Sequence, residues 1–327
     1  MDTYALACDV FLACSSTTLQ TWPEMAGLFN RAAAKRPRDW QLPVRICEAA
    51  GGQAEQAIAA AASLACAQIS IILIDDMLDA DPRGEYRAIG EGAAANLAAA
   101  FQAAALDILS EDGQAGDPAA RLAASRSLNR MLLTTALGQW LDSRNPADEA
   151  SYWKVVETKS APFYGAAMQI GALAAGASPE QAERFAELGR LYGAMIQIHD
   201  DLKDAMAVPA NADWAQGRAS LPILFAQNVD HPERELFQQL RHALKNVPDA
   251  EALAEAQAIL IRCGAVSYSL YALLRRYEAA RALLDALGVE QRAGLEPLFA
   301  DLVRPAREVV ATMAKSPAAA TVRVMAS

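Results

Sequence analysis

Residues 69–79 read Ile-Ser-Ile-Ile-Leu-Ile-Asp-Asp-Met-Leu-Asp, an apolar run that ends in three aspartates. The twelve residues before this run are mostly alanine. Alanine is the best helix former and a poor strand former, so the whole stretch predicts one long helix. Residues 57–74 approach the length of a membrane span, but their serines and glutamine and the aspartates that follow favour a buried core helix.

The rest of the 327-residue chain has the same character, with 53% hydrophobic residues but only 6% aromatic ones. Apolar residues recur at helical spacing, and no β-branched run alternates with polar residues as a strand would. The breaks are short and polar. We therefore predict an all-α bundle that forms a single domain over residues 1–327, with about the last 12 residues as a disordered tail. The expected helices cover residues 52–79, 87–109, 118–142, 149–175, 179–206, 219–227, 233–246, 249–286 and 290–314.

Charge and cysteine content exclude several classes of protein. The net charge of −10 has the wrong sign for a protein that grips a phosphate backbone, so we expect no nucleic-acid partner. The five cysteines form no CxxC pair, which favours free thiols in a reducing cytoplasm. The N-terminus lacks the basic head of a secretory signal, and we expect no transmembrane segment. The three histidines are not at ligand spacing, so any metal would be held by carboxylates.

A second acidic cluster, Asp200-Asp201-Leu-Lys-Asp204, follows another apolar helical run. Like Asp75-Asp76-Met-Leu-Asp79, it has the form DDxxD. Residues four apart share a face of a helix, so the outer two aspartates of each cluster project together and the middle one lies about 100° away. Six carboxylates could therefore converge between two helices. Their mutual repulsion calls for cations, and Mg²⁺ is the ion that habitually bridges carboxylates to phosphate oxygens.

These residues belong to a longer series of landmarks that covers roughly residues 35 to 227. In order and spacing, the series resembles the trans-isoprenyl diphosphate synthases, the polyprenyl synthetase family of class I isoprenoid synthases. The other landmarks are Glu48-Ala-Ala-Gly-Gly52, Gly138-Gln-Trp-Leu-Asp142, Lys159-Ser-Ala161, Gln197 and Gly217-Arg-Ala-Ser-Leu-Pro222.

The resemblance implies a helical bundle around a central deep cavity, usually a homodimer, that holds about three Mg²⁺ ions per site. It implies that Asp75, Asp76, Asp79, Asp200, Asp201 and Asp204 are metal ligands, and that five of these, all but Asp204, together with Lys159 are catalytic. Substrate diphosphates would contact Lys35, Arg36, Arg83, Lys159, Gln197 and Arg218.

The implied reaction is the ionisation of an allylic prenyl diphosphate, followed by attack of isopentenyl diphosphate on the cation. Mg²⁺ and cationic side chains would stabilise the charge on the departing diphosphate, and an apolar cavity would exclude water. No protein nucleophile is needed, in agreement with the absence of a convincing Ser/His/Asp or Cys/His arrangement in the sequence.

The sequence departs from the family in the segment expected to bind isopentenyl diphosphate. Residues 33–40 read Ala-Ala-Lys-Arg-Pro-Arg-Asp-Trp, without the family's glycine pair, and a single arginine, Arg83, follows the first cluster where two are usual. A class I terpene cyclase, a non-elongating prenyltransferase and a partner subunit of a heteromeric synthase therefore remain alternatives. An Ala-rich scaffold with incidental acidic helix ends is the non-enzymatic alternative.

The helix that carries the first cluster also bears on product length. Counting back from Asp75, the positions expected to line the pocket are Ile71, Ser70, Ala67 and Cys66. Most of these side chains are small, whereas bulky aromatics at such positions stop growth early in the family. The resemblance therefore implies a product of about C20 or longer, although ordinary small-residue packing would give the same pattern.

Overall fold

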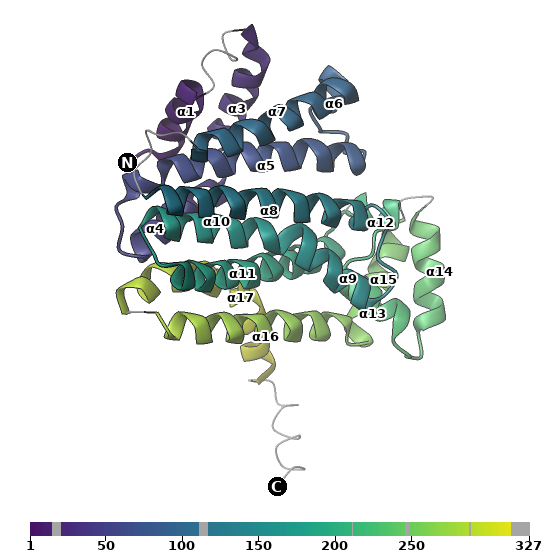
Figure 1. The fold of residues 1–327 in the computed structure, drawn as a ribbon. Coiled ribbons are helices and arrows are strands. Elements are labelled where there is room, and N and C mark those ends of the chain that lie inside the picture. The colour runs from purple at the N-terminus through teal and green to yellow at the C-terminus, as the bar shows by residue number, and fades with distance from the viewer. Residues whose placement is uncertain (15–20, 111–116, 211, 246–248, 288, 315–327) are drawn as a thin grey trace. The chain divides into compact units, whose positions relative to one another are not determined.

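The computed structural model describes residues 1–14, 21–110, 117–210, 212–245, 249–287 and 289–314. Every regular element in this part of the chain is helical, which confirms the predicted all-α class (Figure 1). The expected tail at the C-terminus lies outside the described residues. In order, the elements are α1 (Thr3–Cys14), α3 (Pro23–Ala34), η1 (Arg38–Gln41), α4 (Leu42–Ala49), η2 (Ala54–Ala57), α5 (Ile58–Leu78), α6 (Tyr86–Ile89), α7 (Glu91–Ser110), α8 (Pro118–Asp142), α9 (Glu149–Val155), η3 (Val156–Ser160), α10 (Ala161–Ala174), α11 (Pro179–Ala205), α12 (Ala212–Gln216), α13 (Leu221–Asn228), α14 (Arg234–Leu244), α15 (Ala250–Arg262), α16 (Ala265–Asp285) and α17 (Val289–Ala314).

The chain forms two compact units. The first comprises residues Met1–Ala194 with Leu283–Leu295, and the second comprises Met195–Ala282 with the residues from Glu296 onward. The first acidic cluster lies in the first unit and the second cluster in the second. The expectation of a single domain stays a prediction, because two packing units can belong to one domain.

Helix α5 is the centre of the first unit. It packs against α1, α7, α8 and α10, and α5, α8 and α10 follow one another as neighbouring layers in Figure 1. Alanines let these helices approach closely, and Leu64 and Ala61 of α5 are fully buried. By length and composition, α5 with the turn before it (Ala54–Leu78) and α7 are both apolar enough to cross a membrane. The apolar stretch of α5 is mostly buried inside the protein, as expected for a core helix.

The second unit has a core of its own, built around Trp214, Phe237, Leu253 and Ile259. The rings of Trp214 and Phe237 meet edge to face with centroids 6.3 Å apart. The expected single helix over 249–286 is wrong, because α15 and α16 are separate and bend by 57°. Gly264 lies between them and has a φ of +87°. Glycine adopts this left-handed conformation without strain, and a residue in this conformation commonly ends a helix.

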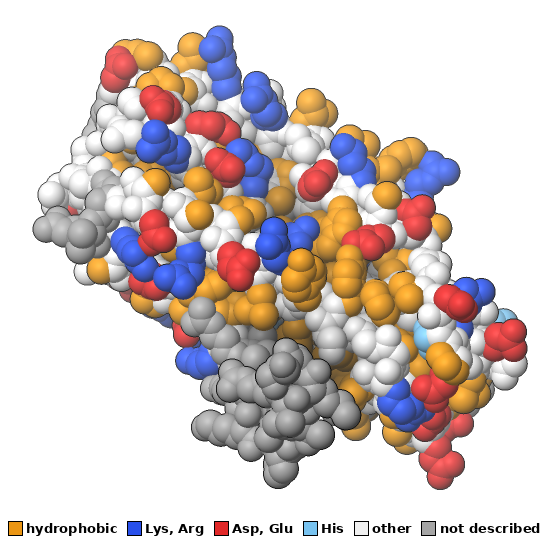
Figure 2. Space-filling view, turned by 90° about the horizontal axis from the view of Figure 1, so that it is seen from below, with side chains coloured by type: hydrophobic (Ala, Val, Ile, Leu, Met, Phe, Trp, Pro, Cys, Tyr) orange, Lys and Arg blue, Asp and Glu red, His pale blue; other side chains and the backbone are white. Residues whose placement is uncertain are grey.

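Other departures from the predicted elements lie in short segments. Helices α1, α3 and α4 precede residue 50, where no helix was expected, and α12 lies inside the predicted break at 208–218. On the face shown in Figure 2, Lys and Arg side chains are interspersed with Asp and Glu. No continuous basic stripe crosses the described part of that face.

Candidate active site

Lys159 joins two carboxylates at one end of the α5–α8–α10 layers. Its Nζ atom lies 2.8 Å from Oδ1 of Asp75 and 2.6 Å from Oδ2 of Asp142. The lysine side chain is 18% exposed. Burial alone would lower the pKa of Lys159, but the two negative charges and their hydrogen bonds outweigh it and raise the pKa above its usual value. The lysine therefore stays charged.

A short π-helical turn, η3, presents Lys159 to its partners. The wider turn interrupts the helix that runs from α9 into α10, and such turns occur frequently at functional sites. Gly138 of α8 packs directly beneath it, because a Cβ added to this glycine would lie 2.3 Å from the backbone nitrogen of Lys159. Only glycine lets α8 approach the turn so closely. The close packing of α8 against η3 therefore requires glycine at position 138.

Asp142, the second partner of Lys159, is not among the residues predicted from the sequence to act in the site. It ends α8, four residues after Gly138, and it was visible only as the last residue of a landmark. Gln139, from the same landmark, is 4% exposed and donates from Nε2 to the carbonyl of Ile71 at 3.0 Å. The landmark therefore ties α8 to the end of α5 that carries the first acidic cluster.

The other members of the first cluster lie at the C-terminal end of α5. Asp76 is half-buried, and burial together with the neighbouring charges of Asp81 and Asp75 raises its pKa. Asp79 caps the helix, and its backbone N–H donates to the carbonyl of Asp75 at 2.8 Å. Such a concentration of partly desolvated negative charge favours a bound cation.

Arg83, a predicted diphosphate contact, is paired within its own loop. Its Nη2 and Nε atoms lie 2.8 Å and 3.1 Å from the carboxylate of Asp81, and they lower the pKa of that carboxyl to about 2. The Arg83 side chain is 88% exposed. Exposed ion pairs contribute only about 0–1 kcal/mol, so a diphosphate could take the place of Asp81 at small cost.

In the second cluster, Asp201 is buried and both of its oxygens are engaged. Oδ1 accepts from Nε2 of Gln197 at 2.8 Å, and Oδ2 accepts from the backbone N–H of Leu221 at 2.8 Å. Asp201 thereby satisfies one of the first N–H groups of α13. Asp200 and Asp204 flank it on α11 and are more exposed. Arg218 lies three residues before Leu221, and its Nε atom donates to Oε1 of Gln216 at 3.0 Å.

The two predicted basic residues of the N-terminal segment, Lys35 and Arg36, are consecutive in the chain but have different surroundings. Lys35 is exposed at the end of α3, whereas Arg36 turns towards α1. Its guanidinium lies 3.2 Å from Asp2 and 4.5 Å from the ring centroid of Tyr4. Arg36 has a φ of +51°, in the left-handed region that costs a non-glycine residue free energy. The role of Lys35 and Arg36 in binding a substrate diphosphate stays a prediction.

The donor set fits Mg²⁺. Within the described residues, no three Asp, Glu, His or Cys side chains gather closely enough to hold a metal ion by themselves. Mg²⁺ usually binds through one or two carboxylates plus substrate phosphates, so it does not require a complete protein cage. Burial and the nearby charges of Asp81 and Asp75 raise the pKa of Asp76, as expected where carboxylates lie close together. Whether all six aspartates are ligands stays a prediction.

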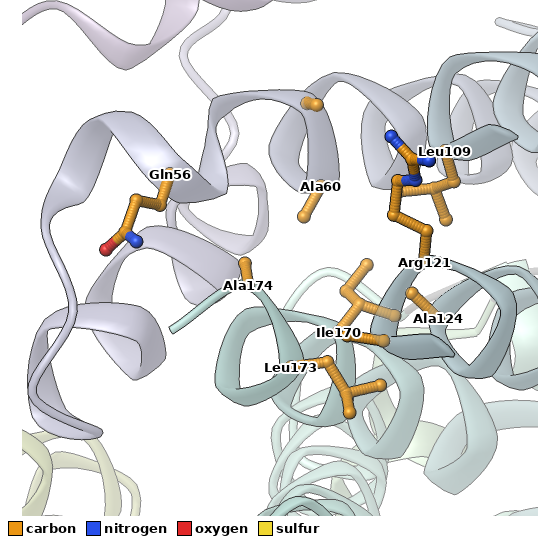
Figure 3. Close-up of a pocket in the computed structure, with 10 residues that line it drawn as sticks. Gln56, Ala60, Leu109, Arg121, Ala124, Ile170, Leu173 and Ala174 are labelled. Carbon is orange, nitrogen blue, oxygen red and sulfur yellow. The ribbon is translucent and has the colours of Figure 1, made fainter. Parts of the chain in front are cut away.

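The four expected pocket residues all lie on α5. Cys66, Ala67 and Ser70 are fully buried and Ile71 is half-buried, while the Ser70 hydroxyl has no hydrogen-bond partner. A small pocket with a volume of ≈ 40 Å³ opens near the other end of the same helix. Figure 3 shows Ala60 of α5 facing Ile170 of α10 and Ala124 of α8 across this pocket. It is apolar apart from Gln56 and Arg121.

Comparison with known proteins identifies the family to which the chain is similar. The family model described as "Polyprenyl synthetase" matches residues 27–260. A geranylgeranyl diphosphate synthase of Methanosarcina mazei is 28% identical over 274 residues, which cover 78% of this chain and 81% of that protein. An octaprenyl diphosphate synthase of Haemophilus influenzae is 29% identical over 147 residues, but this alignment covers only 43% of each chain.

Solved structures show the same fold. A decaprenyl diphosphate synthase of Rhodobacter capsulatus superimposes with a TM-score of 0.79, over 93% of this chain and 96% of that one. Its sequence is 18% identical, so this likeness concerns the fold. The predicted resemblance and the predicted helical architecture are both confirmed.

Proposed function

The chain belongs to the polyprenyl synthetase family and is a trans-prenyltransferase, and we propose that it extends an allylic prenyl diphosphate with isopentenyl diphosphate. The observation that carries this proposal is the Lys159–Asp75–Asp142 cluster at the end of an apolar core helix. A fixed cation beside acidic side chains suits the binding of a metal-complexed diphosphate. The apolar layers behind it suit a hydrocarbon chain.

In this proposal, the carboxylates of Asp75, Asp76 and Asp79 and those of the second cluster hold Mg²⁺. When bound, Mg²⁺ stabilises the negative charge that develops on the departing diphosphate. Lys159 orients Asp75 and adds a fixed positive charge, and Arg83 and Arg218 contact phosphate oxygens. The allylic C–O bond breaks, and its electron pair leaves with the diphosphate. The double bond of isopentenyl diphosphate then attacks the allylic carbon, and loss of a proton completes the longer chain.

Water must be kept from the allylic cation during this reaction. The residues of α5 that precede the first cluster provide an apolar wall, since Leu73 is 3% exposed and Ile69 is 5% exposed. Exclusion of water also strengthens the electrostatic contacts to the diphosphate. The burial of α5 thus supports both the ionisation of the substrate and the protection of its cation.

We place the product at about C20 or longer. The pocket beside Ala60 lies fifteen residues from Asp75 along α5, or roughly 22 Å at 1.5 Å per residue. Small side chains occupy α5 over much of this length, so a prenyl chain that grows along the helix would meet few bulky groups. The names of the matched relatives, which make geranylgeranyl and octaprenyl products, agree with this range.

A homodimer is part of the proposal. Helix α8 exposes Leu133, Leu137 and Trp140, which lie at i, i+4 and i+7 on one side of the helix and are 74%, 46% and 53% exposed. A monomer rarely leaves such an apolar stripe in water. A cytoplasmic location is supported by the five cysteines, all of which lie in the described part of the chain and none of which forms a disulfide.

Removal of the acidic clusters tests the proposed chemistry. Asp75→Ala and Asp200→Ala should each lower the rate of diphosphate release from an allylic substrate by several orders of magnitude. Asp107→Ala, on the exposed side of α7, is the matched control and should retain the rate. A scaffold with incidental acidic helix ends would show no such difference, because its binding to a partner would not depend on these carboxylates.

A further inference from the structure

Two buried polar side chains hold the segment that follows the second acidic cluster. Nη2 of Arg241, on α14, donates to the carbonyls of Gly217 and Arg218 at 2.6 Å and 2.7 Å. Nε2 of Gln257, on α15, donates to the carbonyls of Ala205 and Ala207 at 3.1 Å and 3.0 Å. We call Arg241 and Gln257 the carbonyl clamp. It grips the segment near both of its ends.

Arg241 is an unusual choice for a purely structural contact. Its side chain is 4% exposed, and no carboxylate pairs with it in the part of the chain that the structure describes. Its Nε atom is buried without a hydrogen-bond partner, and burial lowers the pKa of the guanidinium to about 10. Burial of an unpaired charge opposes folding, and an apolar side chain of the same size often gives equal or better stability.

The clamped segment carries groups assigned to the diphosphate site. Arg218 follows Gly217 directly, and its backbone N–H donates to the carbonyl of Asp213 at 2.9 Å. Three residues later, the N–H of Leu221 reaches Asp201 of the second cluster. One of the two carbonyls that Arg241 binds belongs to Arg218 itself, so Arg241 fixes the backbone from which the Arg218 side chain projects.

The opposite end of the clamp acts on the end of α11. Ala205 is the last residue of that helix and directly follows Asp204, the third aspartate of the second cluster. The last carbonyls of a helix have no partner within the helix, and Gln257 supplies one for Ala205. The hydrophobic core around Trp214 and Phe237 holds α12 and α14 together, and the members of α15 in the same core hold Gln257 in register with them.

We propose that Arg241 and Gln257 are positioning residues for diphosphate binding, with Arg241 acting through Arg218 and Gln257 acting through the end of α11. This inference rests on the proposed function, since it assigns the two residues to the substrate site of that reaction. Neither side chain touches the diphosphate. Each one positions a backbone segment, and side chains on that segment bind the diphosphate or its metal ion.

A double-mutant cycle tests the link between Arg241 and Arg218. Arg241→Met, Arg218→Met and the double variant are compared with wild type for the KM of farnesyl diphosphate, with Mg²⁺ and isopentenyl diphosphate in excess. Arg241→Met should raise KM about tenfold, which corresponds to about 1.4 kcal/mol, and should leave kcat largely unchanged. In the Arg218→Met background, the same substitution should have almost no further effect. Arg262→Met, which removes a surface arginine paired with Glu233 and Glu255, is the control and should leave KM unchanged.

Hydrogen exchange gives a structural readout of the same link. Arg241→Met should speed exchange of the Leu221 amide, which is bound to Asp201, while the α5 amides of the first unit stay protected. Gln257→Met should leave the Arg218 cycle intact and instead raise the Mg²⁺ concentration needed for half-maximal rate. If Arg241→Met does not fold, Arg241→Lys, which keeps the charge but has a single donor group, is used in the same cycle.

Two results would overturn the inference. One is a folded Arg241→Met protein with unchanged KM, and the other is an equal loss with and without Arg218, which would indicate a role in folding alone. Failure of the proposed function would look different, because the wild-type protein would then not extend farnesyl diphosphate to a prenyl diphosphate of greater chain length. In that case, calorimetric titration of each variant with inorganic diphosphate and Mg²⁺ measures the affinity for diphosphate and so tests the inference without catalysis. Arg241→Met should again weaken binding about tenfold, and equal binding would contradict the clamp.

Discussion

Nζ of Lys159 lies 2.6 Å from Oδ2 of Asp142 and 2.8 Å from Oδ1 of Asp75, so one lysine holds the ends of two helices that are distant in sequence. Asp75 cannot give this oxygen fully to a metal while Lys159 is bound to it. Asp142 therefore matters, because it shares the positive charge of the lysine and weakens the grip of Lys159 on Asp75.

Asp142→Asn should raise the Mg²⁺ concentration required for half-maximal rate. The substitution leaves Asp75 as the only carboxylate paired with Lys159, so Mg²⁺ must compete with a stronger ion pair. We expect a shift of roughly threefold to tenfold, corresponding to about 0.7–1.4 kcal/mol. Rates measured across a Mg²⁺ titration check this. Asp107→Asn, on exposed α7, should show the wild-type midpoint, and an unchanged midpoint in Asp142→Asn would mean that Lys159 does not compete with the metal.

Gly138→Ala should damage both stability and activity. The added Cβ would lie 2.3 Å from the nitrogen of Lys159 and 2.4 Å from the carbonyl carbon of Thr158, so backbone must move. Overpacking of this kind costs about 1–3 kcal/mol, which thermal unfolding measures. Gly92→Ala, where nothing lies within 4 Å of the added Cβ, should be neutral or slightly stabilising. Equal melting temperatures for the two variants would contradict the close approach of α8 to η3.

Ser70→Phe should shorten the product. The serine is fully buried on α5, one turn before the first cluster, and a ring there would block growth of the chain along the helix. Mass spectrometry of the dephosphorylated products gives the chain-length distribution. Ile72→Phe, at a 49% exposed position of the same helix, is the control. Circular dichroism confirms that both variants fold, and an unchanged distribution in a folded Ser70→Phe protein would show that this face of α5 does not line the product pocket.

Asp76→Asn should raise the melting temperature at neutral pH when Mg²⁺ is absent. Burial and the charges of Asp81 and Asp75 raise the pKa of Asp76 in the folded state, so its ionisation opposes folding. The stability that protonation restores is present below the pKa of the unfolded state and is lost as pH rises through the folded-state pKa. The benefit of Asp76→Asn should therefore disappear as pH falls to about 4. A difference in melting temperature that is the same at every pH would contradict this account.

Much of the first unit could be predicted from sequence because its helices are long and strongly patterned. The expected helix 118–142 has the same bounds as α8 (Pro118–Asp142), where proline begins the helix and polar residues follow its end. The helices before residue 50 were missed because α1 is largely apolar, with Asp9 as its one charged residue, and because α3 and α4 are short, which leaves little periodic signal. The bend between α15 and α16 depends on Gly264, a residue that helices also tolerate internally.

The candidate site, like the fold, could be predicted from the sequence only in part. The two acidic clusters carry local patterns, so their place at the ends of α5 and α11 could be predicted. Lys159 was found from its own short landmark. The partners of these residues could not be predicted, because the Lys159–Asp142 pair depends on a π-helical turn and on the close approach of α8. Arg241 and Gln257 have no local signal at all. Their role is apparent only when the carbonyls that they bind are known.

The most direct measurement of the central claim is product analysis after incubation with Mg²⁺ and farnesyl diphosphate, with and without isopentenyl diphosphate. Extracts are examined before and after phosphatase treatment. We expect longer prenyl alcohols that appear only when isopentenyl diphosphate was present and only after phosphatase, as a chain-elongating prenyltransferase requires. Hydrocarbons or cyclic alcohols formed from farnesyl diphosphate alone would contradict the account and identify a terpene cyclase, with the segment from Lys35 to Trp40 no longer serving as a binding site.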